Sequence, residues 1–313
     1  MARGQEESFG VEFAAIAHFL RCRLQAAAVL SSQKLGISSF GQNCLELQAI
    51  PLRAVKGGTQ VVYVSAIALK LANAWKTAVL DIATLIAAHL LPADESNHSS
   101  TNAALQNFTV KVVPPGWIYL QLSDVGTAAW LQHLAQAPPW VGSRWDCEQV
   151  SRWDCEQVEN YPRRLFDSQY AHARCCSLLR LAHREGIIEL AEPDLQISPH
   201  FWSVKAPDPI PWLDSDQKLR LVHPAERSLI FDLLTLLDDL YCISRSRPIE
   251  GEKSASNLSQ VFLTFYSQCR IWGEVKTENP QLAQARLGLI LATQSLLHLL
   301  LQDLLGVPAP LEL

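Results

Sequence analysis

The stretch Gln-Tyr-Ala-His-Ala-Arg-Cys-Cys-Ser-Leu-Leu-Arg-Leu-Ala, residues 169–182, decides the fold of this chain. Apolar and small residues recur in it at three- and four-residue spacing, which predicts one packed face of an amphipathic helix made by Tyr170, Ala173, Ser177, Leu178 and Leu181. Arg174, Arg180 and Arg184 lie off this stripe and predict a solvated basic face. The rest of the C-terminal half is expected to pack as a helical bundle around this helix.

The size and composition of the chain predict about two soluble globular domains. Its 313 residues are 49% hydrophobic and 18% charged, which suffices for a core in each domain. Polar residues interrupt even the apolar run Leu289–Leu301, so no membrane span is expected. Residues 1–7 lack the hydrophobic core of a secretory signal, and the cytoplasm is therefore the expected location.

The cysteines and histidines do not predict a metal site. None of the eight cysteines forms a CxxC pair, and the nine histidines are scattered without a ligand-like spacing. Reduced, mostly buried thiols are the better interpretation. We therefore expect no metal and no cofactor.

Charge is unevenly distributed along the chain. Residues 1–142 carry 9 Lys+Arg and 8 Asp+Glu, whereas residues 143–313 carry 17 and 23, a net charge of −6. A domain that grips nucleic acid through its overall charge would show the opposite balance. This counts against tight RNA binding by the C-terminal half.

Residues 1–137 are expected to form a small α+β domain. Hydrophobic spacing predicts a helix over 9–32 and further helices over 65–72 and around Ile82–His89, with a polar stretch between residues 36 and 58. Residues 108–113 and 117–122 alternate as two strands joined at Pro-Pro-Gly, and Ser123 or Asp124 can cap the helix that follows. Residues 94–107 are expected to be a loop.

Residues 159–313 are expected to be all-α, which makes the chain mostly helical overall. The proline-rich segment 192–216 is expected to lack secondary structure, and a helix should begin near Pro224. Residues 244–256 are predicted as a polar loop, followed by helices over 258–266 and 285–305. Residues 138–158 form the predicted linker, in which Ser-Arg-Trp-Asp-Cys-Glu-Gln-Val occurs twice without change. The copy is too short for a solenoid repeat, and either a recent duplication or a sequencing duplication explains it.

The Gln-Tyr-Ala-His-Ala-Arg string resembles the first helix of the DALR anticodon-binding domain of arginyl-tRNA synthetases. The helix at 258–266 and the closing Ala-Arg-Leu run at 285–287, which ends in Leu-Leu-Gly-Val at 304–307, are similar to later helices of that domain. Upstream, segments 68–72, 81–83 and 115–119 resemble in order the additional N-terminal domain of the same enzymes. The resemblance covers about residues 60–135 and 145–313.

The catalytic core of such a synthetase is not found between the two resembling parts. Its His-Ile-Gly-His-like and Lys-Met-Ser-Lys-Ser-like signatures do not occur, and Met1 is the only methionine. A doubly wound nucleotide fold also needs several βαβ units of about 30 residues. No other nucleotide-binding or hydrolase motif replaces it. We therefore expect no catalytic residues and no aminoacylation by this chain alone.

The resemblance implies candidate RNA contacts in both domains. In the family, the hairpin of the additional domain touches the tRNA elbow, and Trp117 and Tyr119 occupy those positions. Two tyrosines and a C-terminal methionine surround the anticodon in the DALR domain. Tyr170 matches the second tyrosine, Asp167 stands at the first with Phe166 beside it, and Leu313 ends the chain.

Basic residues near the same helix complete the candidate set. They are Arg163, Arg164, Arg174, Arg180 and Arg184, with His172 as a further candidate for a phosphate or base contact. Within such a helix, however, His172 and Arg174 more often stabilise the bundle.

Two functions remain open at this stage. The first is a non-catalytic tRNA-binding protein, with tRNA(Arg) as the natural ligand and a full-length synthetase as a conceivable protein partner. The second is a protein-interaction adaptor that has lost anticodon reading. An unrelated helical enzyme has no supporting constellation of acid, base or nucleophile.

Overall fold

The computed structural model describes residues 15–37, 46–56, 60–90, 107–136, 165–191, 202–242 and 251–313. Their contacts divide the chain into an N-terminal unit, Ala15–Ala129, and a C-terminal unit, Trp130–Leu313. The predicted domain boundaries at 137/138 and 158/159, the loop at 94–106 and the duplicated octapeptide lie outside the described residues.

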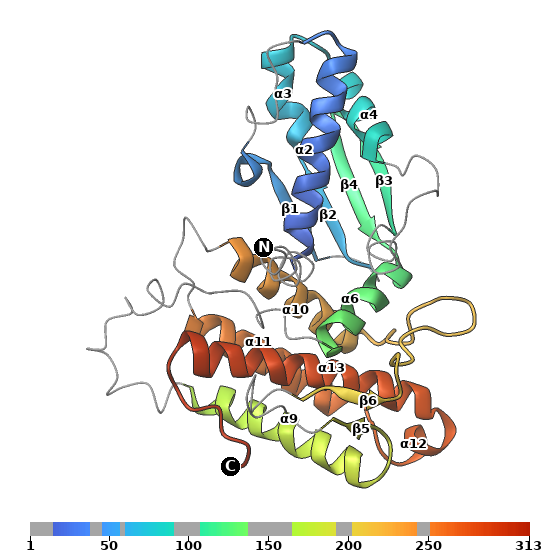
Figure 1. Ribbon diagram of the computed structural model, residues 1–313, viewed down its shortest axis with the longest axis vertical. Helices are drawn as coiled ribbons and strands as arrows, with labels where there is room; N and C mark the ends of the chain where they lie inside the picture. The colour runs from blue at the N-terminus through green and yellow to red at the C-terminus, as the bar shows by residue number, and fades with distance from the viewer. Residues whose placement is uncertain are drawn as a thin grey trace, which may run out of the picture. The chain divides into compact units, whose positions relative to one another are not determined.

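A four-stranded antiparallel sheet forms the base of the N-terminal unit (Figure 1). Its strands are β1 (Leu52–Val55), β2 (Val62–Ser65), β3 (Phe108–Val113) and β4 (Trp117–Leu122), in the order β1-β2-β4-β3. The predicted hairpin at 108–122 is confirmed to the residue. Gly116 is required at its turn, because its φ is +152° and a Cβ there would overlap Val79.

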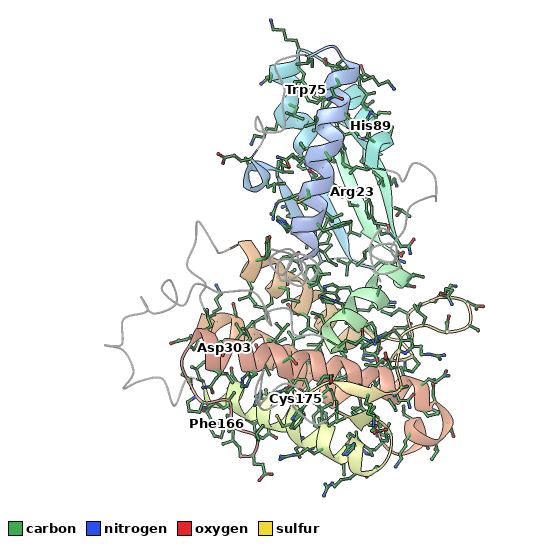
Figure 2. The ribbon with its side chains drawn as sticks, in the orientation of Figure 1. Arg23, Trp75, His89, Phe166, Cys175 and Asp303 are labelled. Atoms are coloured by element: carbon green, nitrogen blue, oxygen red, sulfur yellow. The ribbon has the colours of Figure 1, made fainter. Side chains whose placement is uncertain are left out.

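Three helices pack together over one face of this sheet: α2 (Ile16–Lys34), α3 (Ile67–Trp75) and α4 (Val79–Leu90). The Arg23 guanidinium on α2 donates to the Leu90 carbonyl at 3.1 Å and so ties α2 to the end of α4 (Figure 2). The predicted α+β architecture is therefore confirmed. Strand β1 is a correction, since residues 36–58 were predicted only as a polar stretch. It is a short strand at the edge of the sheet and pairs only with β2.

Helix α6 (Asp124–Gln136) follows the hairpin, and the boundary between the two units falls within it. The Ser123 hydroxyl accepts from the Gly126 amide at 3.0 Å, which confirms the predicted serine cap. In the second half of α6, the Gln132 side-chain carbonyl accepts from the Trp212 indole at 2.8 Å and from the Ile210 amide at 3.0 Å. This glutamine therefore fixes the segment that precedes α10.

The C-terminal unit is a helical bundle, as predicted. It contains α9 (Phe166–Arg184), α10 (Pro224–Cys242), α11 (Gly251–Gln268), the short α12 (Glu274–Glu278) and α13 (Pro280–His298). Helix α13 contacts α9, α10 and α11, and a π-helical turn, Leu299–Leu304, continues it. Residues 287–297 of α13 are all buried, so this helix forms the core of the bundle.

The length of α13 differs from the expectation that no apolar run reaches the length of a membrane span. Pro280–Leu304 is long and apolar enough for a span, but 78% of that window is buried inside the protein. Burial within a bundle is the ordinary reason for a helix that is apolar on all sides.

Two predicted loops are partly structured. Residues 251–256 belong to the first turns of α11, where Gly251 and Ala255 are buried. Residues 244–250 of this predicted loop lie outside the described residues. In the proline-rich segment, β6 (Val204–Ala206) pairs antiparallel with β5 (Glu189–Leu190), and Leu213 bridges to Leu219. In both segments, tertiary packing supplies partners that the polar or proline-rich composition does not indicate.

A buried ion pair joins α10 to α13. Glu226 and Arg286 lie 2.6 Å apart, with side-chain exposures of 0% and 11%. The second carboxylate oxygen of Glu226 accepts from the His223 amide at 2.8 Å and so caps α10, whose start at Pro224 was predicted. Arg286 also donates to the Arg270 carbonyl. The Ala-Arg-Leu run is thus a structural element of the bundle.

Candidate nucleic-acid interface

Helix α9 buries a different face from the one that its spacing predicts. Tyr170 and Ser177 are exposed and Leu181 is half-buried, so the predicted stripe is partly wrong. The buried face is composed mainly of small and polar residues, namely Ser168, Ala171, His172, Ala173, Cys175, Cys176, Leu178, Leu179 and Ala182. The reason is that α9 contacts both α11 and α13, which makes its buried arc wide.

His172 lies at the centre of this face and is 0% exposed. Its Nδ1 lies 2.8 Å from the Pro310 carbonyl oxygen, which can only accept, so Nδ1 carries a proton and donates. Its Nε2 lies 3.0 Å from the Gln294 amide nitrogen and accepts from it. The ring joins α9 to α13 and to the C-terminal tail, and it has no exposed surface for RNA. This favours the structural interpretation of His172.

The thiols beside His172 are held protonated by burial. Burial raises the pKa of Cys176 to about 12 against a weaker opposing effect of Arg180, and it raises the pKa of Cys175 well above its ordinary value. In the folded protein both groups are neutral near pH 7. The described cysteines Cys22, Cys175, Cys176 and Cys269 are free thiols.

The C-terminal tail, residues 305–313, lies against α9 and is held through its backbone. The Gln169 side chain donates to the Pro308 carbonyl at 2.9 Å, and the Arg180 guanidinium donates to the Leu311 carbonyl at 2.9 Å. Arg180 also pairs with Glu312 at 3.0 Å. The tail contacts of Gln169 were not predicted, because no pattern in the sequence shows where residues 308–311 dock.

Arg174 is engaged inside the bundle as well. Its guanidinium donates to the Tyr266 hydroxyl on α11 and lies over the same ring, 4.9 Å from the centroid. The side chain is partly buried. Two of the predicted RNA-binding arginines, Arg174 and Arg180, thus have protein partners in this structure.

Two aromatic side chains remain exposed at the start of α9. Phe166, labelled in Figure 2, is 53% exposed and Tyr170 is 44% exposed. A separation of four residues places them on one side of the helix. Asp167 beside them is exposed too. Gln169, within the same turn, holds Pro308 of the tail, whose last residue Leu313 is 66% exposed. Arg163 and Arg164 lie outside the described residues.

In the N-terminal unit, Trp117 and Tyr119 lie on β4 and are half-buried. They alternate with Ile118, Leu120 and Leu122, which are at most 4% exposed beneath the helices. The two aromatics therefore point to the opposite face of the sheet. Tyr119 lies directly across from Lys111 on β3 and from Val64 on β2.

The described residues contain no group of three or more His, Cys, Asp or Glu side chains placed to hold a metal ion. What the α9 surface offers chemically is stacking and apolar contact from Phe166, Tyr170 and Leu313. Such contacts are suited to unstacked bases.

Comparison with known proteins assigns the C-terminal region. Residues 168–313 match the family model of the DALR anticodon binding domain. The chain is similar to arginine–tRNA ligases of Synechococcus sp. (strain JA-3-3Ab), 36% identical over 142 residues, and of Gloeobacter violaceus, 34% identical over 152 residues. The enzyme of Moorella thermoacetica is 33% identical over 144 residues. No solved structure matches the chain.

The matched lengths limit what these relatives say about this chain. The alignments with the Synechococcus, Gloeobacter and Moorella enzymes cover 45%, 48% and 45% of this chain but only 21%, 22% and 21% of the respective ligases. Residues 168–313 therefore match the DALR anticodon-binding domain, as the resemblance predicted. The similarity of the upstream region to the additional domain remains a prediction.

Proposed function

We propose that this chain binds tRNA without aminoacylating it, through its DALR domain and its N-terminal sheet, with tRNA(Arg) as the preferred ligand. The observation that carries the proposal is the exposed pair Phe166 and Tyr170 on α9 of a DALR domain. The names of the matched relatives, arginine–tRNA ligases, support the choice of tRNA(Arg).

The anticodon loop is the part of tRNA that fits the α9 surface. Its bases are single-stranded, and aromatic stacking on such bases contributes about 1–3 kcal/mol each. Gln169 and His172 hold the tail against α9, so Leu313 can add apolar contact from a fixed backbone. Asp167 and Glu312 repel phosphate, which favours contact through bases over contact through the backbone.

The tRNA elbow is the proposed ligand of the N-terminal unit. Its unpaired bases can stack on Trp117 and Tyr119, which share the face of the sheet opposite the helices. The two contacts together would bind both arms of one tRNA, and the linked arrangement would raise the overall affinity.

Filter binding of a tRNA(Arg) transcript at physiological salt tests the proposal. We expect Phe166→Ala/Tyr170→Ala to weaken binding about tenfold or more. The matched control is Val222→Ala, since Val222 is 69% exposed in the same unit but lies outside α9. Equal affinity for the transcript and for unrelated RNA would sink the proposal.

A protein-interaction adaptor is the second candidate. Arg174 and Arg180 already have partners within the protein, and residues 143–313 carry a net charge of −6. Both observations weaken the electrostatic case for RNA binding. A full-length synthetase is the partner to test first. If the chain captures a protein partner whose association survives nuclease treatment, and if it does not bind tRNA, the adaptor function is supported.

A further inference from the structure

The register of the N-terminal sheet brings two cations and a tyrosine into one row across all four strands. Arg53 on β1 lies opposite Val64 on β2, Val64 lies opposite Tyr119 on β4, and Tyr119 lies opposite Lys111 on β3. Residues directly opposite one another in antiparallel strands point to the same face. The row therefore runs Arg53–Val64–Tyr119–Lys111 on the face that the helices leave uncovered.

The side chains of this row are available to a ligand. Arg53 and Lys111 are exposed, Tyr119 is half-buried, and only Val64 is buried between them. Within the described part of the chain, Arg53, Lys111 and Tyr119 make no side-chain hydrogen bond or ion pair. This contrasts with Arg174 and Arg180, which have partners in the C-terminal unit.

No acidic residue neighbours the row on this face among the paired positions of the described strands. The neighbouring positions of the same face are Val55, Val62, Thr109, Val113, Trp117 and Gln121, none of which is acidic. Residues 15–129 as a whole carry 8 Lys+Arg against 5 Asp+Glu. The N-terminal unit therefore has the charge balance that the C-terminal half lacks.

We propose that Arg53 and Lys111 are phosphate-binding residues of a single-stranded RNA site on this sheet face, flanking a base that stacks on Tyr119. The two cations are three strands apart, or about 14 Å at the usual strand spacing. Tyr119 lies one strand from Lys111 and two strands from Arg53, so a base stacked on it has a cation on each side to bind its phosphates. This inference rests on the proposed tRNA binding and adds the residues that fix the path of the strand.

A cation on an edge strand also has a structural use, because it discourages pairing with the edge of another sheet. Arg53 and Lys111 both lie on edge strands, so the two roles must be separated by measurement. An edge-protecting cation affects self-association but not the salt dependence of RNA binding.

The experiment measures binding of the full chain to a tRNA(Arg) transcript and to a single-stranded oligouridylate across a salt series. Arg53→Gln/Lys111→Gln should lower affinity about tenfold and reduce the slope of log affinity against log salt by about 1.4, since each contact on a single strand contributes about 0.7. Lys34→Gln/Lys76→Gln removes the same charge from two exposed positions on the helical side of the unit and should leave both quantities unchanged.

Tyr119 provides a second, charge-independent test. Tyr119→Leu should weaken oligouridylate binding about tenfold, whereas Tyr119→Phe keeps the ring and should bind like the unaltered protein. An unchanged salt slope in Arg53→Gln/Lys111→Gln, or self-association as its only effect, overturns the inference. If the protein does not prefer tRNA(Arg) but binds oligouridylate in a way that depends on Arg53, the proposed function is rejected and the sheet-face site is retained. If the protein binds neither RNA, both are rejected.

Discussion

The two candidate RNA surfaces use their cations in opposite ways. In the C-terminal unit, Arg174 lies over Tyr266, and Arg180 pairs with Glu312. In the N-terminal unit, Arg53 and Lys111 have no side-chain partner among the described residues and flank an aromatic ring on a sheet face. The family match, however, falls on the C-terminal unit.

This difference shows that residues of a family motif can be engaged in contacts inside the domain. The Gln-Tyr-Ala-His-Ala-Arg string contains three residues with contacts inside the domain: Gln169 and His172 hold the tail, and Arg174 holds α11. Only Tyr170 in the string presents a large exposed side chain. The residues of this string therefore serve mainly to hold the bundle together.

The largest effect is expected at the buried ion pair of the C-terminal unit. Glu226→Ala leaves Arg286 buried without its carboxylate and should lower the free energy of unfolding by about 3–5 kcal/mol. Urea unfolding followed by circular dichroism measures this. Glu189→Ala, which removes the exposed partner of Lys205, is the control and should change little. A small effect of Glu226→Ala would contradict the view that this unit depends on its internal charges.

Arg174→Ala should separate stability from RNA binding. We expect a loss of about 1–3 kcal/mol in unfolding free energy, because both the hydrogen bond and the cation–π contact with Tyr266 disappear. Tyr266→Phe removes only the hydroxyl and should cost less. If Arg174→Ala weakens tRNA binding strongly at temperatures where the variant is fully folded, the assignment of this arginine to the bundle is wrong.

Glu312→Gln should leave Arg180 without a carboxylate partner, as Arg53 and Lys111 are among the described residues of the N-terminal unit. The Arg180–Glu312 pair is solvent-exposed, so its loss should change stability by less than about 1 kcal/mol. Without the carboxylate, the charge of Arg180, which still donates to the Leu311 carbonyl, should steepen the salt dependence of tRNA binding by up to about one unit of slope. The variant Glu312→Gln/Arg180→Ala is the control, and an equal slope in both would show that Arg180 does not reach the RNA.

The smallest effect near neutral pH concerns the buried thiols. Burial raises the pKa of Cys176 to about 12 and, with Glu226 nearby, that of Cys269 to about 11. A raised folded-state pKa stabilises the protein below the ordinary thiol value near 9, and this contribution is lost as the pH rises toward 11–12. Alkylation at pH 8 should leave Cys176 and Cys269 unmodified until the protein is unfolded, as read by peptide mass spectrometry. Modification of either thiol in the folded protein would contradict this prediction.

Local chemistry explains which parts of the fold the sequence predicts well. The hairpin at 108–122 combines strict alternation with Pro-Pro-Gly, and Gly116 fits a turn that a side chain would block. The start of α10 follows from Pro224 and the Glu226 cap. Prediction missed β1, β2, β5, β6 and the first turns of α11, because each is stabilised by a tertiary partner that local composition does not show.

The amino-acid sequence by itself determined the fold class, the resemblance of the C-terminal region to the DALR domain and the candidates Phe166 and Tyr170, although its spacing placed Tyr170 on the packed face and the structure shows it exposed. These depend on short-range periodicity and on a specific string of side chains. Only the tertiary structure decided which candidate side chains contact other residues of the protein and which are available to a ligand. The reason is that the partners of His172, Arg174 and Arg180 come from residues 92 to 138 positions away, and strand register alone aligns Arg53, Tyr119 and Lys111.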